Sequence, residues 1–182
     1  MKYAHYAPTT GQLLGWYAPD LFKVEDIPVP HLVVTDAEWQ EALTLSFNKV
    51  DAVTKTLSKY DFRELSTLKE DRSLSLDSKC SFEILKGFTS EALGVSHFYP
   101  SKLEDQLNLM AAKALGVSVG FACEIDGIWL KREHTAEQLT QVAMDGAFHK
   151  IALIQKKDAL VDLINAATSN AEVLAITWDT QI

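Results

Sequence analysis

The sequence lacks the features of a membrane protein and of a nucleic-acid-binding protein. Nowhere do about 18 consecutive apolar residues occur, the length that spans a bilayer. Basic residues form only isolated pairs, at 131–132 and 156–157, in a chain whose formal net charge is -8. The first five residues do not begin a basic head followed by an apolar segment, so no signal peptide is expected. A membrane span and an extended nucleic-acid surface are therefore not predicted.

Signatures of metal and cofactor sites are also missing. No Cys-x-x-Cys or His-Glu-x-x-His occurs, and no two histidines lie three or four apart on an expected helix. Gly116-x-x-x-Gly120 is not followed by Lys-Ser or Lys-Thr, so it is no phosphate-binding loop. The only cysteines, Cys80 and Cys123, are expected to be reduced thiols in or near the core. We therefore expect neither a metal nor a cofactor.

What the sequence does contain is the composition of a globular α+β protein. Its 182 residues suit one domain of average size, or one domain with a small appendage. An apolar fraction of 47% with 23% charged residues is sufficient for a sizeable core. We expect a β-rich N-terminal arm over residues 1–65 and a domain of hairpins and helices over residues 66–182. The second domain should include a long C-terminal helix.

The N-terminal arm is expected to be mostly strand and turn. Four of the five prolines lie in the first 30 residues, where they disfavour helix. Aromatic residues over 3–6 and 13–17 flank a turn and predict a hairpin. Thr35-Asp36 predicts the start of a helix over 37–43, whereas 47–60 is compatible with either a strand or a helix.

Turn and cap residues predict the order of elements in the second domain. A helix is expected somewhere within 66–86, with Gly87 ending it. Residues 88–99 predict a hairpin with Gly94 at its turn, and Ser101 is a suitable N-cap for a helix over 102–115 that Gly116 ends. Asp126-Gly127 predicts a second hairpin with a type I′ turn.

The last part of the chain predicts a long helix. Thr135 with Gln138 three residues later forms a capping box, and the apolar pattern continues from 136 to about 167. A final short turn over 171–176, capped by Ser169 or Asn170, should bring Trp178 back toward the core.

Four polar residues are predicted to act as structural clamps between hairpins and helices: His97, Asp105, Asn108 and His134. A metal site of His97, His134 and Cys123 is the alternative, but it lacks ligand spacing. A nucleophilic trio of Ser96, His97 and Asp105 is rejected because no Gly-x-Ser-x-Gly elbow supports it. Paired-carboxylate hydrolysis would need a second acid near Asp105, and the adjacent Glu104 points elsewhere around the helix. No catalytic residue is assigned.

Two sets of residues are candidates for a protein interface. The aromatic set of the arm includes Tyr6, Trp16 and Tyr17, which a short hairpin would not bury alone. Docking on a partner and packing on the chain's own main domain stay equally open for this set. The long helix also carries small residues, Ala143, Gly146 and Ala147, that would let another element approach closely.

Several short motifs are shared with a known family. In the second domain they are Gly87-Phe88-Thr89-Ser90, Ala92-Leu93-Gly94, His97-x-Tyr99, Asp105-Gln106-x-Asn108-Leu109, His134-Thr135, Gln138-Leu139, Asp145-Gly146, Ile164–Ala167 and Ala175-Ile176. From about residue 82 to 178 the sequence resembles the C-terminal domain of unknown function found in tail-fibre and tail-fibre-assembly proteins of tailed phages and prophages. Three N-terminal segments, at 6–11, 27–28 and 34–39, are similar to the N-terminal pattern of phage tail-fibre assembly proteins.

The resemblance implies a non-enzymatic tail-fibre component or tail-fibre assembly protein that acts by binding other phage tail proteins. It implies a place in the virion tail, or in the host cytoplasm during assembly, and a homo-oligomer for which three copies are favoured. It supplies no catalytic residue and no cofactor. The alternatives are a host-surface receptor-binding module and, less favoured, a small hydrolase of cell-envelope glycans.

Overall fold

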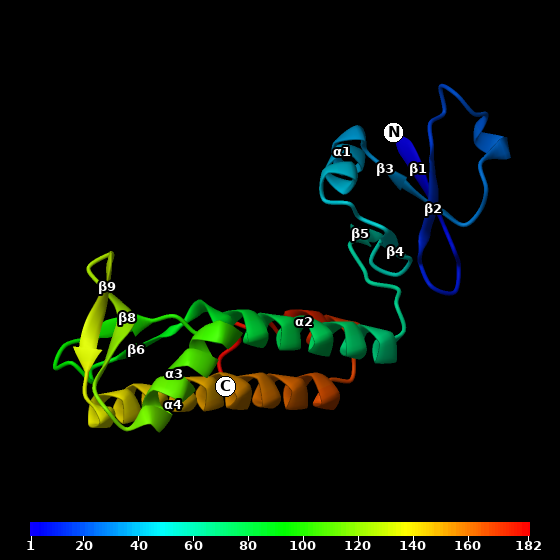
Figure 1. Cartoon of the computed structure of the whole chain (residues 1–182). Helices are drawn as coiled ribbons and strands as arrows, with labels where there is room; N and C mark the ends of the chain where they lie inside the picture. The colour runs from blue at the N-terminus through cyan, green and yellow to red at the C-terminus, as the bar shows by residue number, and fades with distance from the viewer. The chain divides into compact units, whose positions relative to one another are not determined.

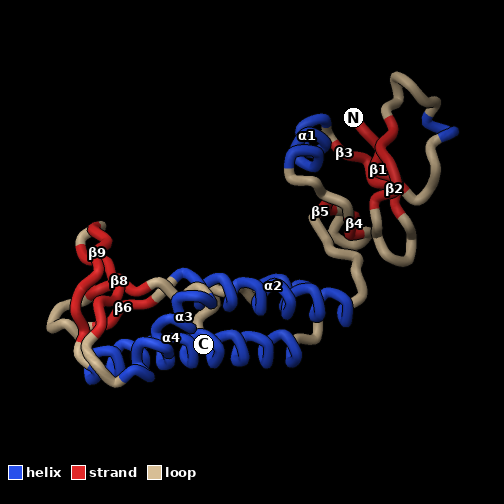
Figure 2. Tube along the Cα trace, in the orientation of Figure 1, coloured by secondary structure: helices blue, strands red, loops and turns tan.

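The computed structural model describes all 182 residues, which form two compact units, Met1–Phe62 and Arg63–Ile182. The fold is α+β, as the sequence predicts, and each unit contains both helices and strands (Figures 1 and 2). The expected arm ends at residue 65, whereas the first compact unit ends at residue 62. The side chain of Arg63 forms an ion pair with Asp71, which attaches this part of the chain to the second unit.

The N-terminal unit is built around a three-stranded antiparallel sheet with the order β2-β1-β3. Its strands are β1 (Lys2–Tyr6), β2 (Leu13–Tyr17) and β3 (His31–Val34). The predicted hairpin is β1–β2, and β3 adds a strand that the sequence did not predict. A 3₁₀ turn, Val24–Asp26, lies in the proline-rich connection before β3. Ala4, Tyr6 and Val50 form the small core.

One helix and a short hairpin complete this unit. The helix α1 (Asp36–Thr44) begins at the predicted N-cap, Thr35, whose backbone N–H donates to the Glu38 carboxylate at 2.7 Å. The segment left open between strand and helix forms two strands, β4 (Lys49–Asp51) and β5 (Thr56–Ser58). A hairpin forms here because the Asp51 carboxylate accepts hydrogen bonds from the backbone N–H groups of Val53 and Thr54 and so closes the turn between the two strands.

Two long helices lie side by side in the C-terminal unit, α2 (Leu65–Lys86) and α4 (Ala136–Ala166) (Figure 1). The short α5 (Asn170–Ala175) packs on α2. These three helices bury an apolar cluster of Leu68, Leu76, Leu160, Ile164, Ala167, Val173 and Ile176. The Arg72 guanidinium fixes α5 to α2, because it donates to the carbonyl oxygens of Leu174 and Ile176 at 2.9 and 2.8 Å.

The other half of this unit is a four-stranded antiparallel sheet with the order β6-β7-β8-β9. Its strands are β6 (Phe88–Ser90), β7 (His97–Tyr99), β8 (Val119–Ile125) and β9 (Ile128–His134), and α3 (Leu103–Leu115) connects β7 to β8. Both predicted hairpins are confirmed. Asp126 and Gly127 have φ angles of 51° and 78°, the pair of positive values that a type I′ turn requires.

Most predicted helix ends are confirmed, but one is wrong. Thr135 caps α4 with Gln138 completing the capping box, and Gly116 ends α3 in the left-handed conformation. The N-cap of α3 is Lys102 and not Ser101. The Asp105 carboxylate accepts from the Lys102 backbone N–H at 3.0 Å, so the helix begins one residue later than Ser101 would place it.

Both cysteines are buried and free, Cys80 on α2 and Cys123 on β8. Burial raises the pKa of the Cys80 thiol, which donates to the Leu153 carbonyl oxygen. None of the helices combines the length and the apolar character that crossing a membrane would require.

Candidate functional site

The sheet, α3 and α4 enclose a second apolar core of the C-terminal unit. It consists of Phe88, Tyr99, Leu109, Ala112, Cys123, Leu139 and Val142. The polar residues singled out in the sequence lie in this core or near it, and an apolar hollow opens beside it. This region is therefore the candidate functional site.

Tyr99 and His134 form a fully buried polar pair in this core. The Tyr99 hydroxyl lies 2.8 Å from His134 Nε2, and His134 Nδ1 lies 2.8 Å from the Arg132 carbonyl oxygen. A proton on Nδ1 satisfies both bonds, since the carbonyl can only accept and Nε2 then accepts from the hydroxyl. Burial, with the Cys123 thiol nearby, raises the pKa of Tyr99 well above its usual value. The pair fixes β7 to the end of β9.

The other predicted clamps have more local roles. His97 is 5% exposed, and its Nδ1 lies 2.8 Å from the Val95 carbonyl oxygen inside the β6–β7 hairpin. Asp105 caps its own helix through the Lys102 backbone. Asn108 is exposed on α3 and takes no part in these bonds. Gln106 Nε2 donates to the Ser101 carbonyl oxygen at 2.9 Å and so holds the first turns of α3 to the loop that follows β7.

The structure does not bring together the residues of the metal site or of the nucleophilic trio that were considered from the sequence. No group of three or more His, Cys, Asp or Glu side chains is arranged to hold a metal ion. His97 bonds a backbone carbonyl and Asp105 a backbone N–H, so neither is oriented toward the other or toward Ser96. The structure thus gives no geometric basis for the trio.

A polar hollow that the sequence did not predict lies between β6 and α4. The Ser90 hydroxyl donates to Asp145 Oδ2, and Gln141 Nε2 donates to Asp145 Oδ1 at 2.7 Å. Thr89, Glu91 and Ser96 complete the lining of this hollow, which has a volume of about 390 Å³. Both oxygens of Asp145 are already bonded, so this carboxylate fixes β6 on α4. Its partner Ser90 lies 55 residues away, which explains why local sequence patterns did not reveal the contact.

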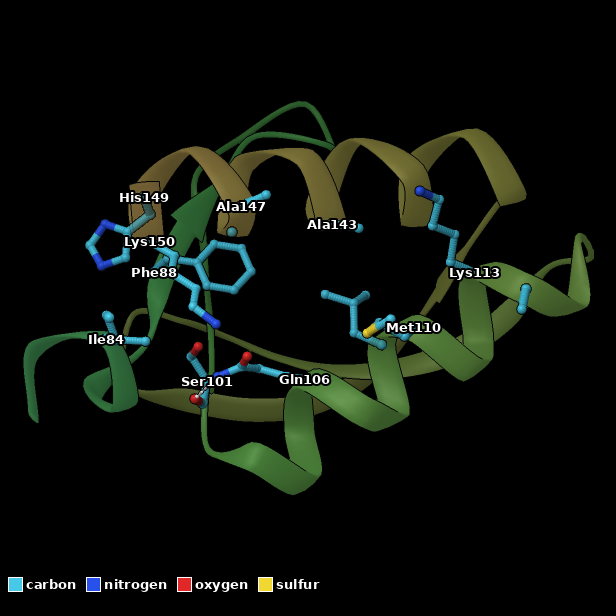
Figure 3. Close-up of a pocket in the computed structure, with 13 residues that line it drawn as sticks. Ile84, Phe88, Ser101, Gln106, Met110, Lys113, Ala143, Ala147, His149 and Lys150 are labelled. Atoms are coloured by element: carbon cyan, nitrogen blue, oxygen red, sulfur yellow. Dashed lines mark hydrogen bonds between the residues drawn. The ribbon is translucent and has the colours of Figure 1, made fainter. Parts of the chain in front are cut away.

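An apolar groove of about 500 Å³ is lined by α3 and α4, with the end of α2 and the start of β6 at one end (Figure 3). We call it the α3–α4 groove. Its lining residues are Ile84, Phe88, Ser101, Gln106, Leu109, Met110, Lys113, Ala114, Ala143, Gly146, Ala147, His149 and Lys150. The Nε2 atom of His149 is buried without a hydrogen-bond partner. Carbon-rich side chains dominate the lining, and most polar atoms lie at its margins.

Charge on the α3–α4 groove has one sign. Lys113 and Lys150 are its only charged lining residues apart from the titratable His149, and no Asp or Glu lines it. Neither lysine forms an ion pair. Figure 3 shows Lys113 at the Ala143 end and Lys150 toward the end where Ile84 lies. In a chain of net charge -8, the groove is a local exception.

An exposed apolar stripe borders the α3–α4 groove on each helix. The α3 stripe is Leu103, Leu107 and Met110, and the α4 stripe is Met144, Phe148 and Ile151. Their side chains are 45% to 68% exposed. Each residue of the α4 stripe follows a groove-lining residue by one position and so lies about 100° further around the helix. Contiguous apolar surface of this kind marks interaction sites.

The small residues of α4 contribute to the groove and to the core of this chain. An added Cβ at Gly146 would lie 2.7 Å from a ring atom of Phe88, so this glycine makes room for Phe88. Ala143 packs partly against the core, and Ala147 is exposed on the groove. The close approach expected at Gly146 is therefore made by Phe88 of the same chain, because β6 lies directly on this turn of α4.

The aromatic residues of the N-terminal unit pack mainly within it. Tyr6 is 6% exposed and belongs to the core, and Trp16 packs partly against that core. Tyr17 stacks on His5 and contacts Phe22 edge-on. The β1–β2 hairpin does not bury these side chains alone, since residues of β3 and of β4–β5 in the same unit supply the packing partners of Tyr6 and Trp16. Tyr6 is consequently not accessible to a partner.

Comparison with protein-family models, with curated proteins and with solved structures finds no match for this chain.

Proposed function

We propose that this chain is a non-enzymatic component of a bacteriophage tail-fibre apparatus, or an assembly protein for it, that acts by binding other tail proteins. The observation that carries the binding role is the α3–α4 groove with its two exposed apolar stripes. The phage context comes from the sequence resemblance of residues 82–178 and of the N-terminal segments.

The bonding of the polar core residues supports a binding role over a catalytic one. His97 and His134 each bond a backbone carbonyl, and Asp145 bonds the side chains of Ser90 on β6 and of Gln141 on its own helix. Groups held in this way stabilise the fold, whereas a nucleophile or general base must reach a substrate. The α3–α4 groove is apolar and has no carboxylate in its lining that could act in hydrolysis.

We expect the protein to self-associate, and the resemblance favours three copies. A surface for this lies on α2, where Leu74, Phe82 and Leu85 are exposed on one face. Light scattering coupled to size exclusion at tens of micromolar protein should give a mass of three chains. Phe82→Glu with Leu85→Glu should reduce that mass toward one chain, because each glutamate would have to be desolvated at the contact. A strict monomer for the unmodified protein would contradict self-association.

The assembly role predicts that a fibre protein depends on this chain for solubility. We expect the product of the neighbouring fibre gene to be largely insoluble when expressed alone, and to become soluble and co-purify when this chain is co-expressed. The physical reason is that unpaired fibre segments expose apolar surface which a binding partner covers. Equal solubility with and without this chain, and no co-purification, would refute the proposal.

One further surface favours the receptor-binding alternative. The β8–β9 hairpin exposes Ile128, Trp129 and Leu130 next to its turn, and the Trp129 ring contacts Phe98 edge-on. Aromatic side chains of this type are enriched at recognition surfaces. A receptor-binding module would have to be present in purified virions, whereas an assembly protein would not.

A further inference from the structure

We propose that the α3–α4 groove binds a single amphipathic helix of another protein, one with an apolar face and with Glu or Asp side chains along its edges. The inference rests on the binding role proposed above and identifies the chemistry of the partner segment.

The shape and composition of the groove suit a helix. Met110 of α3 lies across the groove from Ala143 and Ala147 of α4, whose small side chains leave space between the two helices, and Ala114 also lines it. α3 has 13 residues, which corresponds to about 20 Å of helix axis, or three to four turns of an occupant. An amphipathic helix places apolar side chains at i, i+3, i+4 and i+7 in such a groove, and the bordering stripes extend the contact on both sides.

The charge of the groove decides the chemistry of the occupant's edges. Lys113 and Lys150 come from different helices and lie toward opposite ends of the groove. Long lysine stems lie along apolar surface while the ammonium groups reach the margin, where they would meet acidic side chains of a bound helix. With no Asp or Glu in the lining, an occupant with basic edges would meet only repulsion.

The same charges disfavour two other occupants. If two copies met through this groove about a two-fold axis, the same patch of each copy would face the other, and Lys113 and Lys150 would oppose lysines. The carboxylate of a fatty acid would pair with one lysine, and its alkyl chain would cover the apolar floor of the groove. It would leave the second lysine and the two apolar stripes uncovered, because these extend over both helices.

The test uses the full chain and a synthetic helical peptide of about 18 residues, with leucines along one face and glutamates at both edges. The peptide carries a fluorophore, and binding is measured by fluorescence anisotropy. A second peptide has lysine in place of every glutamate. We expect the glutamate peptide to bind at least about tenfold more tightly than the lysine peptide, and the difference to shrink as salt is added.

Three variants connect this preference to the groove. Ala147→Glu, at an exposed position, should weaken binding of the glutamate peptide about tenfold or more, because it adds a carboxylate to the apolar floor. The double variant Lys113→Glu with Lys150→Glu should reverse the preference, so that the lysine peptide binds more tightly. The matched control Lys59→Glu, at an exposed position of the N-terminal unit, should leave both affinities unchanged. Circular dichroism melting should confirm that all variants stay folded.

The proposal is overturned if both peptides bind equally, if neither binds at about 1 mM, or if the double lysine variant keeps the original preference. It is also overturned if Ala147→Glu abolishes one-to-one binding of dodecanoate but leaves peptide binding unchanged, or if Ala147→Glu changes the self-association of the chain instead of peptide binding. Failure of the peptide test together with successful co-expression of the fibre protein would refute the groove assignment alone and leave the binding function standing.

Discussion

Replacing Gly87 by alanine is expected to lower the free energy of unfolding by about 3 kcal/mol or more. Gly87 connects α2 to β6 with a φ angle of 123°, a backbone conformation that residues with a Cβ rarely adopt. The added Cβ would also overlap the Phe98 ring and the Tyr99 carbonyl oxygen on the neighbouring strand. The variant must therefore move β6 away from β7. Urea unfolding followed by circular dichroism would measure the loss.

Gly94→Ala is the matched control for this prediction. Gly94 has a φ angle of 90° at the turn between β6 and β7, and nothing lies within 4 Å of the position of an added Cβ. Only the conformational cost remains there, about 1–2 kcal/mol. If the two alanine variants lose the same stability, crowding at Gly87 is not the cause and the description of this junction is wrong.

Replacing His134 by alanine is expected to cost about 3–5 kcal/mol. The substitution opens a cavity in a fully buried position and removes the partners of both the Tyr99 hydroxyl and the Arg132 carbonyl. Tyr99→Phe keeps the ring and removes only the hydroxyl, so its cost should be about 1–3 kcal/mol. The double variant should lose less than the sum of the two single losses, because both remove the same hydrogen bond. Strict additivity in chemical denaturation would show that the pair is not coupled.

The free energy of unfolding is expected to fall at alkaline pH because the Tyr99 hydroxyl is buried. An unfolded tyrosine ionises near pH 10, whereas burial raises the pKa of Tyr99 in the folded protein. The stabilisation linked to this group is therefore fully present below about pH 10 and is lost as the pH rises toward the folded-state pKa. Tyr99→Phe lacks this group, so the difference in stability between the native protein and the variant should narrow above about pH 10. A constant difference from pH 8 to pH 11 would contradict this reasoning.

Local signals in the sequence were sufficient for most elements of the fold. The turn at Asp126-Gly127, the capping box at Thr135 and the helix end at Gly116 all depend on residues close together in the chain. The third strand of the N-terminal sheet, His31–Val34, was not predicted because its partner is β1, across the proline-rich connection. The start of α3 was misplaced because the Asp105 carboxylate, rather than the Ser101 hydroxyl, supplies the cap bond.

The candidate site depended on contacts that no local pattern contains. His97 and His134 were expected to be structural, but the Tyr99 hydroxyl as the partner of His134 lies 35 residues away in the chain. Gly146 was expected to let another element approach closely, but the sequence did not show that this element is β6, through the ring of Phe88. The groove itself arises only when α3 and α4 pack. Its one visible signal in the sequence is that α3 is apolar on two faces, one buried at Leu109 and one exposed at Leu107.

The order of strands in the C-terminal sheet has a consequence for aggregation. β9 has only β8 as a neighbour, so the backbone groups along its other side are open to pairing with a strand of any chain. Charged side chains at Lys131, Arg132 and Glu133 occupy three successive positions of this edge. A second β9 aligned there in parallel and in register would place each of these charges beside its own kind. The charges thus disfavour growth of the sheet by parallel addition of identical strands at β9.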